Sequence, residues 1–298
     1  MLSFIDLFCG AGGWSTGLKA AGLKHLLGID MDAQAMATYK ANHNHGLLAD
    51  IEKVTRADLP ANADVLVASP PCQSFSLAGK RGEEGGKLCF VVVKIARWLQ
   101  PRIVIIENVP GFLSKGKVHV ELVRQLKSAG YSVLTMTLDA MLYEVPQRRK
   151  RVFVVACRPQ INFQIPKPVA TFDPSLHKLL QNVRKVPEFH WMTPEKTQYY
   201  KERHRRLGYV KFISPEDKQY VSNTVRASYM KSRGAEALIL YRDSRCRMLT
   251  ESECAAVQSF PKNFVWRGTR SAVYKQIGNA VPPKMAYHLG LAVKKALR

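Results

Sequence analysis

The sequence predicts an α/β fold with a parallel, doubly wound sheet and a second, smaller domain. Short apolar runs alternate with helix-like segments up to about residue 157, as in consecutive β-α-β units. Polar residues and glycines follow several of these runs, where strands of such a sheet would end. After residue 158 the alternation stops. We therefore expect a sheet domain at residues 1–157, completed by 270–298, and a small domain at 158–269.

The predicted strands are the short apolar runs Leu2–Phe8, His25–Ile29, Val65–Ala68, Ile103–Ile106, Tyr131–Leu138 and Val152–Ala156. The predicted helices are Trp14–Ala21, Asp32–Asn42, Phe90–Gln100, Val118–Ala129 and, at the end, Lys284–Leu297. In open α/β sheets ligands bind beyond the carboxyl ends of the strands. Gly10, Asp30, Asp50, Cys72 and Glu107 all follow apolar segments, so we expect them to gather along one rim.

The charge balance points to a polyanionic partner. The chain has 45 Lys and Arg residues against 23 Asp and Glu, a formal net charge of +22 with a pI near 9.9. Such a positive field favours nucleic acid. Residues 158–245 alone hold 17 basic against 8 acidic residues, together with eleven aromatic ones. We expect this stretch to form a basic, nucleic-acid-binding lobe; the alternative is an insertion without a binding role.

The cysteines and the apolar runs indicate the cellular compartment in which the protein is expected. The six cysteines show no CxxC pair and no zinc-like spacing, so we expect free thiols and no metal site. The N-terminus lacks the pattern of a signal peptide, and no apolar run approaches the length of a membrane span. We therefore expect a cytoplasmic protein.

A glycine-rich loop follows the first predicted strand. Its sequence, DLFCGAGG (residues 6–13), allows the backbone to approach a ligand closely at the start of a helix. Asp30 lies twenty residues after Gly10, where a carboxylate can hold a ribose hydroxyl. Asp50 closes the next segment, in reach of an adenine amino group. This pattern indicates a nucleoside cofactor and would suit a dehydrogenase equally well.

Cys72 separates these alternatives. A cysteine at a strand end is usually a small buried hydrophobe, but Cys72 lies in the polar turn SPPCQSFS (residues 69–76), after two prolines that stiffen the chain. The turn suits a nucleophilic thiolate, which needs a nearby positive charge or base. Glu107 ends the neighbouring run and would supply an acid. A thiol that attacks C6 of cytosine and an acid that holds N3 would together allow methyl transfer to C5.

The segment QRRKR (residues 147–151) leads into the last predicted strand. Side chains alternate along an extended chain, so Gln147, Arg149 and Arg151 would share one face. We expect Arg151 to bind cytosine O2 and Arg149 to favour the Cys72 thiolate; the alternative is a basic edge that contacts phosphates. Residues 77–88, LAGKRGEEGGKL, have the composition of a lid that closes over an extruded base, or of an idle linker.

Together these motifs resemble the DNA (cytosine-5)-methyltransferase family. DLFCGAGG, SPPCQSFS, ENVPGF, QRRKR and QIGNAVPP (276–283) occur in that family's order and spacing. RMLTESECAAVQSFP (247–261) resembles another family block, and Asn223-Thr224-Val225 resembles part of the target-recognition region. The resemblance covers the chain except most of residues 158–222. It implies a Rossmann-like, S-adenosyl-methionine-dependent methyltransferase sheet with a smaller target-recognition domain.

The resemblance also implies roles for individual residues. The catalytic residues would be Cys72, Glu107, Arg149 and Arg151. S-adenosyl-methionine would be bound by Phe8, Gly10, Gly12, Gly13, Asp30, Met31, Asp50, Ile51, Pro71, Leu88 and Asn279. DNA would be contacted by Gln73, Ser76, Lys80, Arg81, Thr224 and Arg226. The target cytosine in a short, specific double-stranded DNA sequence would flip into the pocket and form a covalent Cys72–C6 intermediate. We expect a monomer whose partner, if any, is a restriction endonuclease linked genetically rather than physically.

The chain departs from the family pattern at Ala256, where many members carry an arginine; this affects a structural ion pair and no catalytic group. The short variable region favours a prokaryotic or phage-type modification enzyme. Two alternatives are a tRNA cytosine-5 methyltransferase of the same superfamily and a non-catalytic, sequence-specific DNA-binding relative. The first usually carries a Cys-Phe-Thr signature that is absent here, and the intact catalytic motifs argue against the second.

Overall fold

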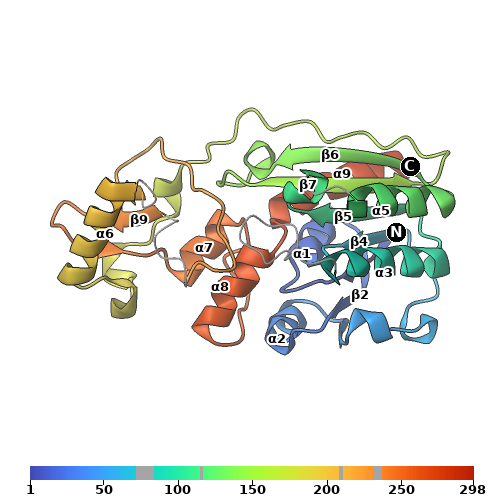
Figure 1. The fold of residues 1–298 in the computed structure, drawn as a ribbon, viewed down its shortest axis with the longest axis horizontal. Helices are drawn as coiled ribbons and strands as arrows, with labels where there is room; N and C mark the ends of the chain where they lie inside the picture. Colours follow the sequence, from blue (N-terminus) through green and yellow to red (C-terminus); the bar gives the residue numbers. More distant parts are fainter. Residues whose placement is uncertain (72–83, 115–116, 208–210, 231–236) are drawn as a thin grey trace.

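The computed structural model describes residues 1–71, 84–114, 117–207, 211–230 and 237–298. Figure 1 shows a sheet domain at one end of the molecule and a smaller lobe at the other, with α7 (Glu251–Val257) and α8 (Arg270–Asn279) between them. The segment that follows the last sheet strand runs back along the sheet domain before it enters the small lobe.

The large sheet has seven strands in the order β3-β2-β1-β4-β5-β7-β6. Their bounds are β1 Ser3–Leu7, β2 Lys24–Asp30, β3 Gly46–Leu48, β4 Val65–Ala68, β5 Ile103–Asn108, β6 Ser132–Asp139 and β7 Lys150–Cys157. Strands β1 to β5 pair in parallel; this was predicted for all of them except β3. The order reverses between β1 and β4, and the carboxyl ends of β1 to β5 therefore form the rim on which such folds bind ligands.

The prediction of a wholly parallel sheet was wrong at one edge. β7 pairs antiparallel with both β5 and β6. A parallel connection needs a crossover of a dozen or more residues, usually a helix. Only residues 140–149 separate β6 from β7, and they contain a single short 3₁₀ helix, η3 (Ala140–Tyr143). The chain therefore turns back at once, which brings the start of β7 beside the end of β5.

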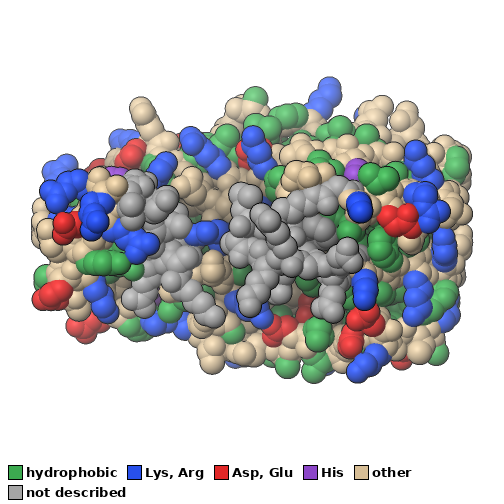
Figure 2. All heavy atoms as spheres, in the orientation of Figure 1, with side chains coloured by type: hydrophobic (Ala, Val, Ile, Leu, Met, Phe, Trp, Pro, Cys, Tyr) green, Lys and Arg blue, Asp and Glu red, His purple; other side chains and the backbone are tan. Residues whose placement is uncertain are grey.

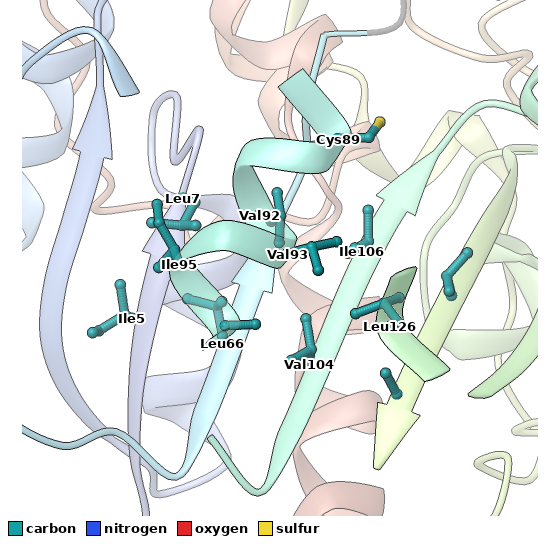
Figure 3. Close-up of a cluster of buried hydrophobic side chains, with 14 of the residues drawn as sticks. Ile5, Leu7, Leu66, Cys89, Val92, Val93, Ile95, Val104, Ile106 and Leu126 are labelled. Carbon is teal, nitrogen blue, oxygen red and sulfur yellow. The ribbon is translucent and has the colours of Figure 1, made fainter. Parts of the chain in front are cut away.

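Helices cover both faces of the sheet. On one face α3 (Glu84–Leu99) and α5 (Lys117–Ser128) pack on alternate residues of the strands, such as Leu66, Val104 and Ile106 (Figure 3). On the other face α1 (Gly13–Ala20) and α9 (Pro283–Ala296) pack against Val65, Val67 and Ile105. Two further helices, α2 (Ala33–Asn42) and α4 (Gly111–Ser114), lie after β2 and β5. Because successive side chains of a strand point to opposite faces of the sheet, the core is divided into two layers.

Glycines allow α1 and α9 to lie in close contact. A Cβ atom on Gly13 would come within 2.1 Å of the Val281 carbonyl oxygen, and one on Gly17 within 2.2 Å of the Pro283 carbonyl oxygen. These distances are far below a normal contact, so only glycine fits at either position. The C-terminal segment therefore completes the sheet domain, and it carries Asn279 toward the rim.

The small lobe has its own core around a three-stranded sheet of order β10-β9-β8. The strands are β8 Lys211–Ile213, β9 Ala237–Leu240 and β10 Cys246–Arg247, and the lobe also contains α6 (Pro194–Leu207). Val273, Tyr274 and Ile277 of α8 are buried in the same core. A boundary at residue 269 would divide this core, because α8 packs with the small lobe and also contacts α2, whereas α9 packs on the large sheet.

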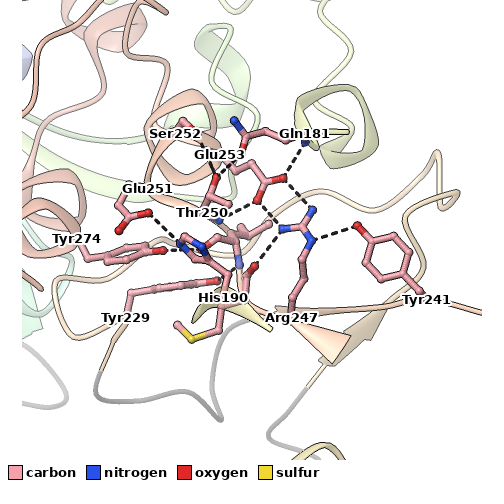
Figure 4. A network of polar contacts seen from close by, with 12 residues as sticks. Gln181, His190, Tyr229, Tyr241, Arg247, Thr250, Glu251, Ser252, Glu253 and Tyr274 are labelled. Atoms are coloured by element: carbon pink, nitrogen blue, oxygen red, sulfur yellow. Dashed lines mark hydrogen bonds and ion pairs between the residues drawn. The ribbon is translucent and has the colours of Figure 1, made fainter. Parts of the chain in front are cut away.

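A buried ion pair joins β10 of the small lobe to α7 (Figure 4). Arg247 donates to both carboxylate oxygens of Glu253 at 2.7 and 2.8 Å, and both side chains are fully buried. Glu253 also accepts from the backbone N–H groups of Gln181 and Thr250, which offsets its desolvation. The block that departs from the family pattern at Ala256 therefore still contains an ion pair.

The remaining sequence predictions concern cysteines and membranes. Cys9, Cys89, Cys157, Cys246 and Cys254 are buried free thiols, as expected; Cys72 lies outside the described residues. In the part of the chain that the structure describes, no helix has the length and apolar character needed to cross a membrane.

Candidate active site

The rim at the carboxyl ends of the strands brings the glycine-rich loop and Asp30 together. The backbone N–H of Gly10 donates to Asp30 Oδ2 at 2.8 Å, and the N–H of Asp32 donates to Asp30 Oδ1 at 2.8 Å. Burial raises the pKa of Asp30, although these two hydrogen bonds oppose the shift. Asp30 is thus fixed in place at the end of β2, with its carboxylate directed at the loop.

The loop has an unusual backbone. Phe8, Gly10 and Gly12 have φ angles of 56°, 53° and 97°, all in the left-handed region. Such a conformation strains a residue like Phe8 and is often found at functional sites. At Gly12 a Cβ atom would come within 2.4 Å of His43 Nε2. Gly12 is the N-cap of α1 and provides no side-chain cap, so the Gly13 and Trp14 N–H groups at the start of the helix have no cap from it, whereas the Ser15 N–H bonds Asp6.

A chain of buried hydrogen bonds supports this loop from behind. Ser15 Oγ donates to Asp6 Oδ2 at 2.7 Å, Tyr39 OH lies 2.7 Å from Ser15 Oγ, and His25 Nε2 lies 2.7 Å from Tyr39 OH. Since Ser15 gives its proton to Asp6, Tyr39 must donate to Ser15 and His25 must donate through Nε2. Burial raises the pKa of Asp6 to about 7 and lowers the pKa of His25 to about 4.

The other predicted cofactor residues lie on neighbouring elements. The Ala49 N–H donates to the Asp30 carbonyl at 3.0 Å, which places Asp50 beside the end of β2. Asp50 caps a 3₁₀ helix, η1 (Ile51–Lys53), through the Glu52 N–H. Met31 is 72% exposed, whereas Ile51 is buried. Leu88 is partly buried on α3, Pro71 is exposed after β4, and Asn279 is exposed at the end of α8.

Glu107 and Arg151 form the polar centre of the site. Arg151 Nε lies 3.0 Å from Glu107 Oε1, and the two side chains are only 12% and 9% exposed. Glu107 belongs to β5, which continues two residues beyond its predicted end, and Arg151 belongs to β7, its antiparallel neighbour. The hairpin that the sequence did not predict therefore creates this contact.

The described chain that leads to Cys72 ends next to this pair. Cys72 and four predicted DNA-contact residues, Gln73, Ser76, Lys80 and Arg81, lie outside the described residues. The segment that leads to them is fixed: Asn108 Nδ2 donates to the Pro70 carbonyl at 3.4 Å, and Trp14 Nε1 donates to Ser69 Oγ at 3.0 Å. Pro70, two residues before Cys72, thus lies beside Asn108, the residue that follows Glu107. Of the expected lid, residues 84–88 belong to α3, and the rest lies outside the described residues.

Arg149 is not part of the Glu107–Arg151 pair and contacts other segments. Its buried guanidinium donates to the carbonyl groups of Val225, Gly278 and Ala280 at 2.9 to 3.0 Å. Gln147 is also buried; it donates to Gln258 Oε1 and accepts from the Val225 N–H. The two side chains therefore join the lobes. Cys72 lies outside the described residues, so the predicted effect of Arg149 on its thiolate stays a prediction.

A hollow of about 600 Å³ opens beside Arg151. It receives residues from both lobes, because Thr224 Oγ1 donates to the Arg148 carbonyl at 2.8 Å. Its lining consists of Pro110, Asp139, Met141, Arg148, Lys150, Arg151 and Thr224. Arg226, the other described DNA-contact candidate, is half-buried, and its backbone lies against Gly278. Asp139 and Met141 were missed by sequence reasoning; the only signal was that Asp139 directly follows a predicted strand.

The architecture is that of Rossmann-like methyltransferases. The DNMT2 protein of Spodoptera frugiperda, solved as a mutant, has a TM-score of 0.80 at 19% identity, with 99% of this chain and 100% of that chain covered. A putative DNA modification methyltransferase encoded within an E. coli prophage has a TM-score of 0.77 at 19% identity, with 100% and 99% covered. At these identities the similarity shows the fold alone.

The sequence identifies the family. The chain belongs to the C-5 cytosine-specific DNA methylase family, whose model matches residues 2–295. Among its relatives, Type II methyltransferase M.AplI of Arthrospira platensis is 33% identical over 304 residues, covering 99% of this chain and 86% of the relative. Type II methyltransferase M.NgoPII of Neisseria gonorrhoeae is 31% identical over 330 residues, covering 99% and 96%.

Proposed function

We propose that this chain transfers a methyl group from S-adenosyl-methionine to C5 of a flipped cytosine in a short, specific sequence of double-stranded DNA. The observation that carries the proposal is the Glu107–Arg151 pair: Asn108, which follows Glu107, bonds Pro70 just before Cys72, and Arg151 lines the hollow shared by both lobes. Cytosine N3 and O2 are neighbouring acceptors on one ring edge. A carboxylic acid and a guanidinium 3.0 Å apart match that edge well.

The described residues fit the cofactor. The left-handed glycine loop and the uncapped start of α1 suit a carboxylate and a ribose, and Asp30 and Asp50 supply acceptors for hydroxyl and amino groups. The exposed Met31 offers an apolar surface for an adenine ring. When bound, S-adenosyl-methionine supplies the methyl group on a positively charged sulfur. The remaining chemistry falls to the side chains of this chain.

The proposed mechanism begins at Cys72. Its thiolate forms a bond with C6 while Glu107 gives a proton to N3 and Arg151 donates to O2, so the charge pushed into the ring is neutralised. C5 then becomes nucleophilic and accepts the methyl group. Loss of the C5 proton to a base breaks the bond between sulfur and C6, and the N3 proton returns to Glu107. The five described cysteines are buried, and burial raises the pKa of the Cys89 and Cys157 thiols to about 12 and 11, which disfavours a nucleophilic role.

The names of the curated relatives support a modification enzyme of a restriction-modification system, with a restriction endonuclease as a genetic partner. We also propose that the protein acts as a monomer in the cytoplasm, on DNA. Methylation of duplex DNA but not of tRNA would separate this function from that of the tRNA methyltransferases. A wild-type protein that binds DNA but incorporates no methyl group would instead be a non-catalytic DNA-binding relative.

A covalent trap tests the mechanism. A duplex with 5-fluorocytosine at the target position should form an adduct with the wild-type protein in the presence of the cofactor, because fluorine cannot leave C5 as the proton does. Cys72→Ser should abolish the adduct, and the matched variant Cys157→Ser should retain it. Glu107→Gln should slow methyl transfer by about 10²-fold or more, the usual contribution of a positioned acid. An adduct that persists in Cys72→Ser would overturn the assignment.

A further inference from the structure

A second hollow, of about 300 Å³, lies in the small lobe next to the first. Polar side chains predominate in its lining, which consists of Arg148, Lys211, Asp217, Gln219, Tyr220, Val221 and Asn223. Arg148 lines both hollows. The second hollow therefore adjoins the hollow lined by Arg151, the residue proposed to bind cytosine O2, and no step of the proposed mechanism uses it.

The wall shared by the two hollows is held firmly. The Arg148 N–H donates to the Ser222 carbonyl at 2.9 Å, and Thr224 Oγ1 donates to the Arg148 carbonyl at 2.8 Å. On the other side, the Leu176 N–H donates to the Tyr220 carbonyl at 2.8 Å. Residues 220–224 are thus tied both to the sheet domain and to the small lobe. A reading site needs this rigidity, because a loose side chain discriminates poorly between bases.

The rim of the hollow is preformed by Asp217. Its Oδ1 atom accepts from the N–H groups of Gln219 and Tyr220 at 2.9 and 3.1 Å, and its own N–H donates to the Ser214 carbonyl at 3.0 Å. An aspartate that bonds the backbone two residues ahead fixes a turn. Its Oδ2 atom makes no hydrogen bond to any residue that the structure describes, and so remains as an acceptor at the rim.

The charged groups match one base pair. Guanine presents two acceptors, N7 and O6, in the major groove, and its partner cytosine presents an amino group there. Arg148 and Lys211 are exposed cations with several donor hydrogens, and Asp217 Oδ2 is an acceptor. Arginine and lysine are the usual partners of guanine, and aspartate accepts from the cytosine amino group. Two donors and one acceptor in one hollow therefore suit the edge of a G·C pair.

We propose that this hollow is a specificity site that reads a G·C base pair flanking the target cytosine, with Lys211 and Arg148 toward guanine and Asp217 toward its partner. The proposal rests on the proposed DNA methyltransferase function. It extends that function to the sequence that the enzyme selects. Phosphate contacts by Lys211 and Arg148 are the competing account, since most contacts of such side chains with DNA go to the backbone.

Two variants test the site. Lys211→Met removes a donor while keeping most of the side-chain length. Asp217→Asn keeps an oxygen for the two backbone N–H groups but allows an amide donor to replace the free acceptor. The matched control is Lys218→Ala, which removes an exposed cation from the same turn but does not line the hollow. For each protein, methylated sites are mapped by sequencing, and kcat/KM is measured on the preferred duplex and on duplexes changed at one flanking pair.

The expected result is that all sites methylated by the wild type share a flanking G·C pair. At that pair, Lys211→Met and Asp217→Asn should reduce discrimination about 10- to 100-fold, the range expected when a good hydrogen-bonded pairing with a base is removed. Lys218→Ala should retain the wild-type discrimination. A wild-type motif without a flanking G·C pair would overturn the proposal. So would variants that weaken all sites equally and lower the salt dependence, because that pattern indicates phosphate contacts. Absence of methyl transfer by the wild type would instead contradict the proposed function itself.

Discussion

Neighbouring residues of one basic segment have different surroundings in this chain. Arg151 lies 3.0 Å from Glu107 in the site, whereas Arg149, two residues earlier, is buried against three carbonyl groups of other segments. Alternation along an extended chain predicted that both would face the same way. The actual surroundings of each side chain depend on how the small lobe and the C-terminal segment pack around β7. That packing cannot be read from local sequence.

Asp6 makes a residue-scale prediction about pH. Its pKa rises from 3.8 to about 7 through burial, so the folded state binds a proton more tightly than the unfolded state. The stability that this provides is complete below pH 3.8 and is lost as the pH rises to about 7. Asp6→Asn can still accept from Ser15 and does not titrate.

The free energy of unfolding of Asp6→Asn, relative to wild type, should therefore increase by about 1 to 3 kcal/mol between pH 5 and pH 8. Urea unfolding of both proteins at the two pH values measures the change. Other titrating groups, such as His25, largely cancel in the difference. A constant offset between the proteins would show that Asp6 does not carry the buried charge.

At the scale of elements, α1 and α9 provide a test of close packing. Gly17→Ala would place a methyl group 2.2 Å from the Pro283 carbonyl oxygen and 2.5 Å from Ala286 Cβ, so the helices must separate. We expect a loss of about 1 to 3 kcal/mol in the free energy of unfolding. Gly278 is unsuitable as a control because it also contacts backbone.

Gly22→Ala is the matched control for this prediction. Its Cβ would approach only the flexible Lys294 Nζ, at 3.1 Å, although its φ of +83° adds some strain. Thermal melting of the two variants should therefore show the larger decrease for Gly17→Ala. Equal decreases would mean that backbone conformation, and not helix contact, limits the stability of this region.

Elements with strong local signals were predictable from the sequence. β4 has its predicted bounds, and β1, β2 and β6 each differ by one residue at each end. The short edge strand β3 was not predicted as a strand, because three residues carry little periodicity. The direction of β7 was also missed, since strand polarity depends on the length of the connection and not on the strand itself. The motifs identified Glu107, Arg151 and Asp30 as candidates, and the structure brings Glu107 and Arg151 together. The hollows could not be predicted, because residues distant in the sequence line them.

The whole molecule combines a sheet domain with a basic lobe, and its charge should control DNA binding. Figure 2 shows Lys and Arg side chains over both lobes on the face viewed, including a group at the end that holds α6. Exposed cations on α6 include Lys196, Arg203, Arg205 and Arg206. Cations that contact phosphates release counterions, so binding weakens as salt rises. With a net charge of +22, a steep dependence is expected.

A paired set of variants tests whether α6 contributes to this binding. Arg203→Gln with Arg206→Gln removes two exposed cations from the small lobe, and Lys24→Gln with Lys127→Gln removes two from the sheet domain. Lys24 begins β2, at the edge opposite the rim, so the control pair should lie away from bound DNA. Both sets lower the net charge equally.

Only the α6 set should reduce the slope of log K against log salt, by about 0.9 for each phosphate that is no longer neutralised by a side chain. Fluorescence anisotropy with one duplex over a salt series measures both slopes. Equal slopes for the two sets would place the flanking DNA on a part of the small lobe other than α6. A reduced slope for the α6 set alone would mean that the small lobe, besides selecting the sequence, supplies part of the affinity for DNA.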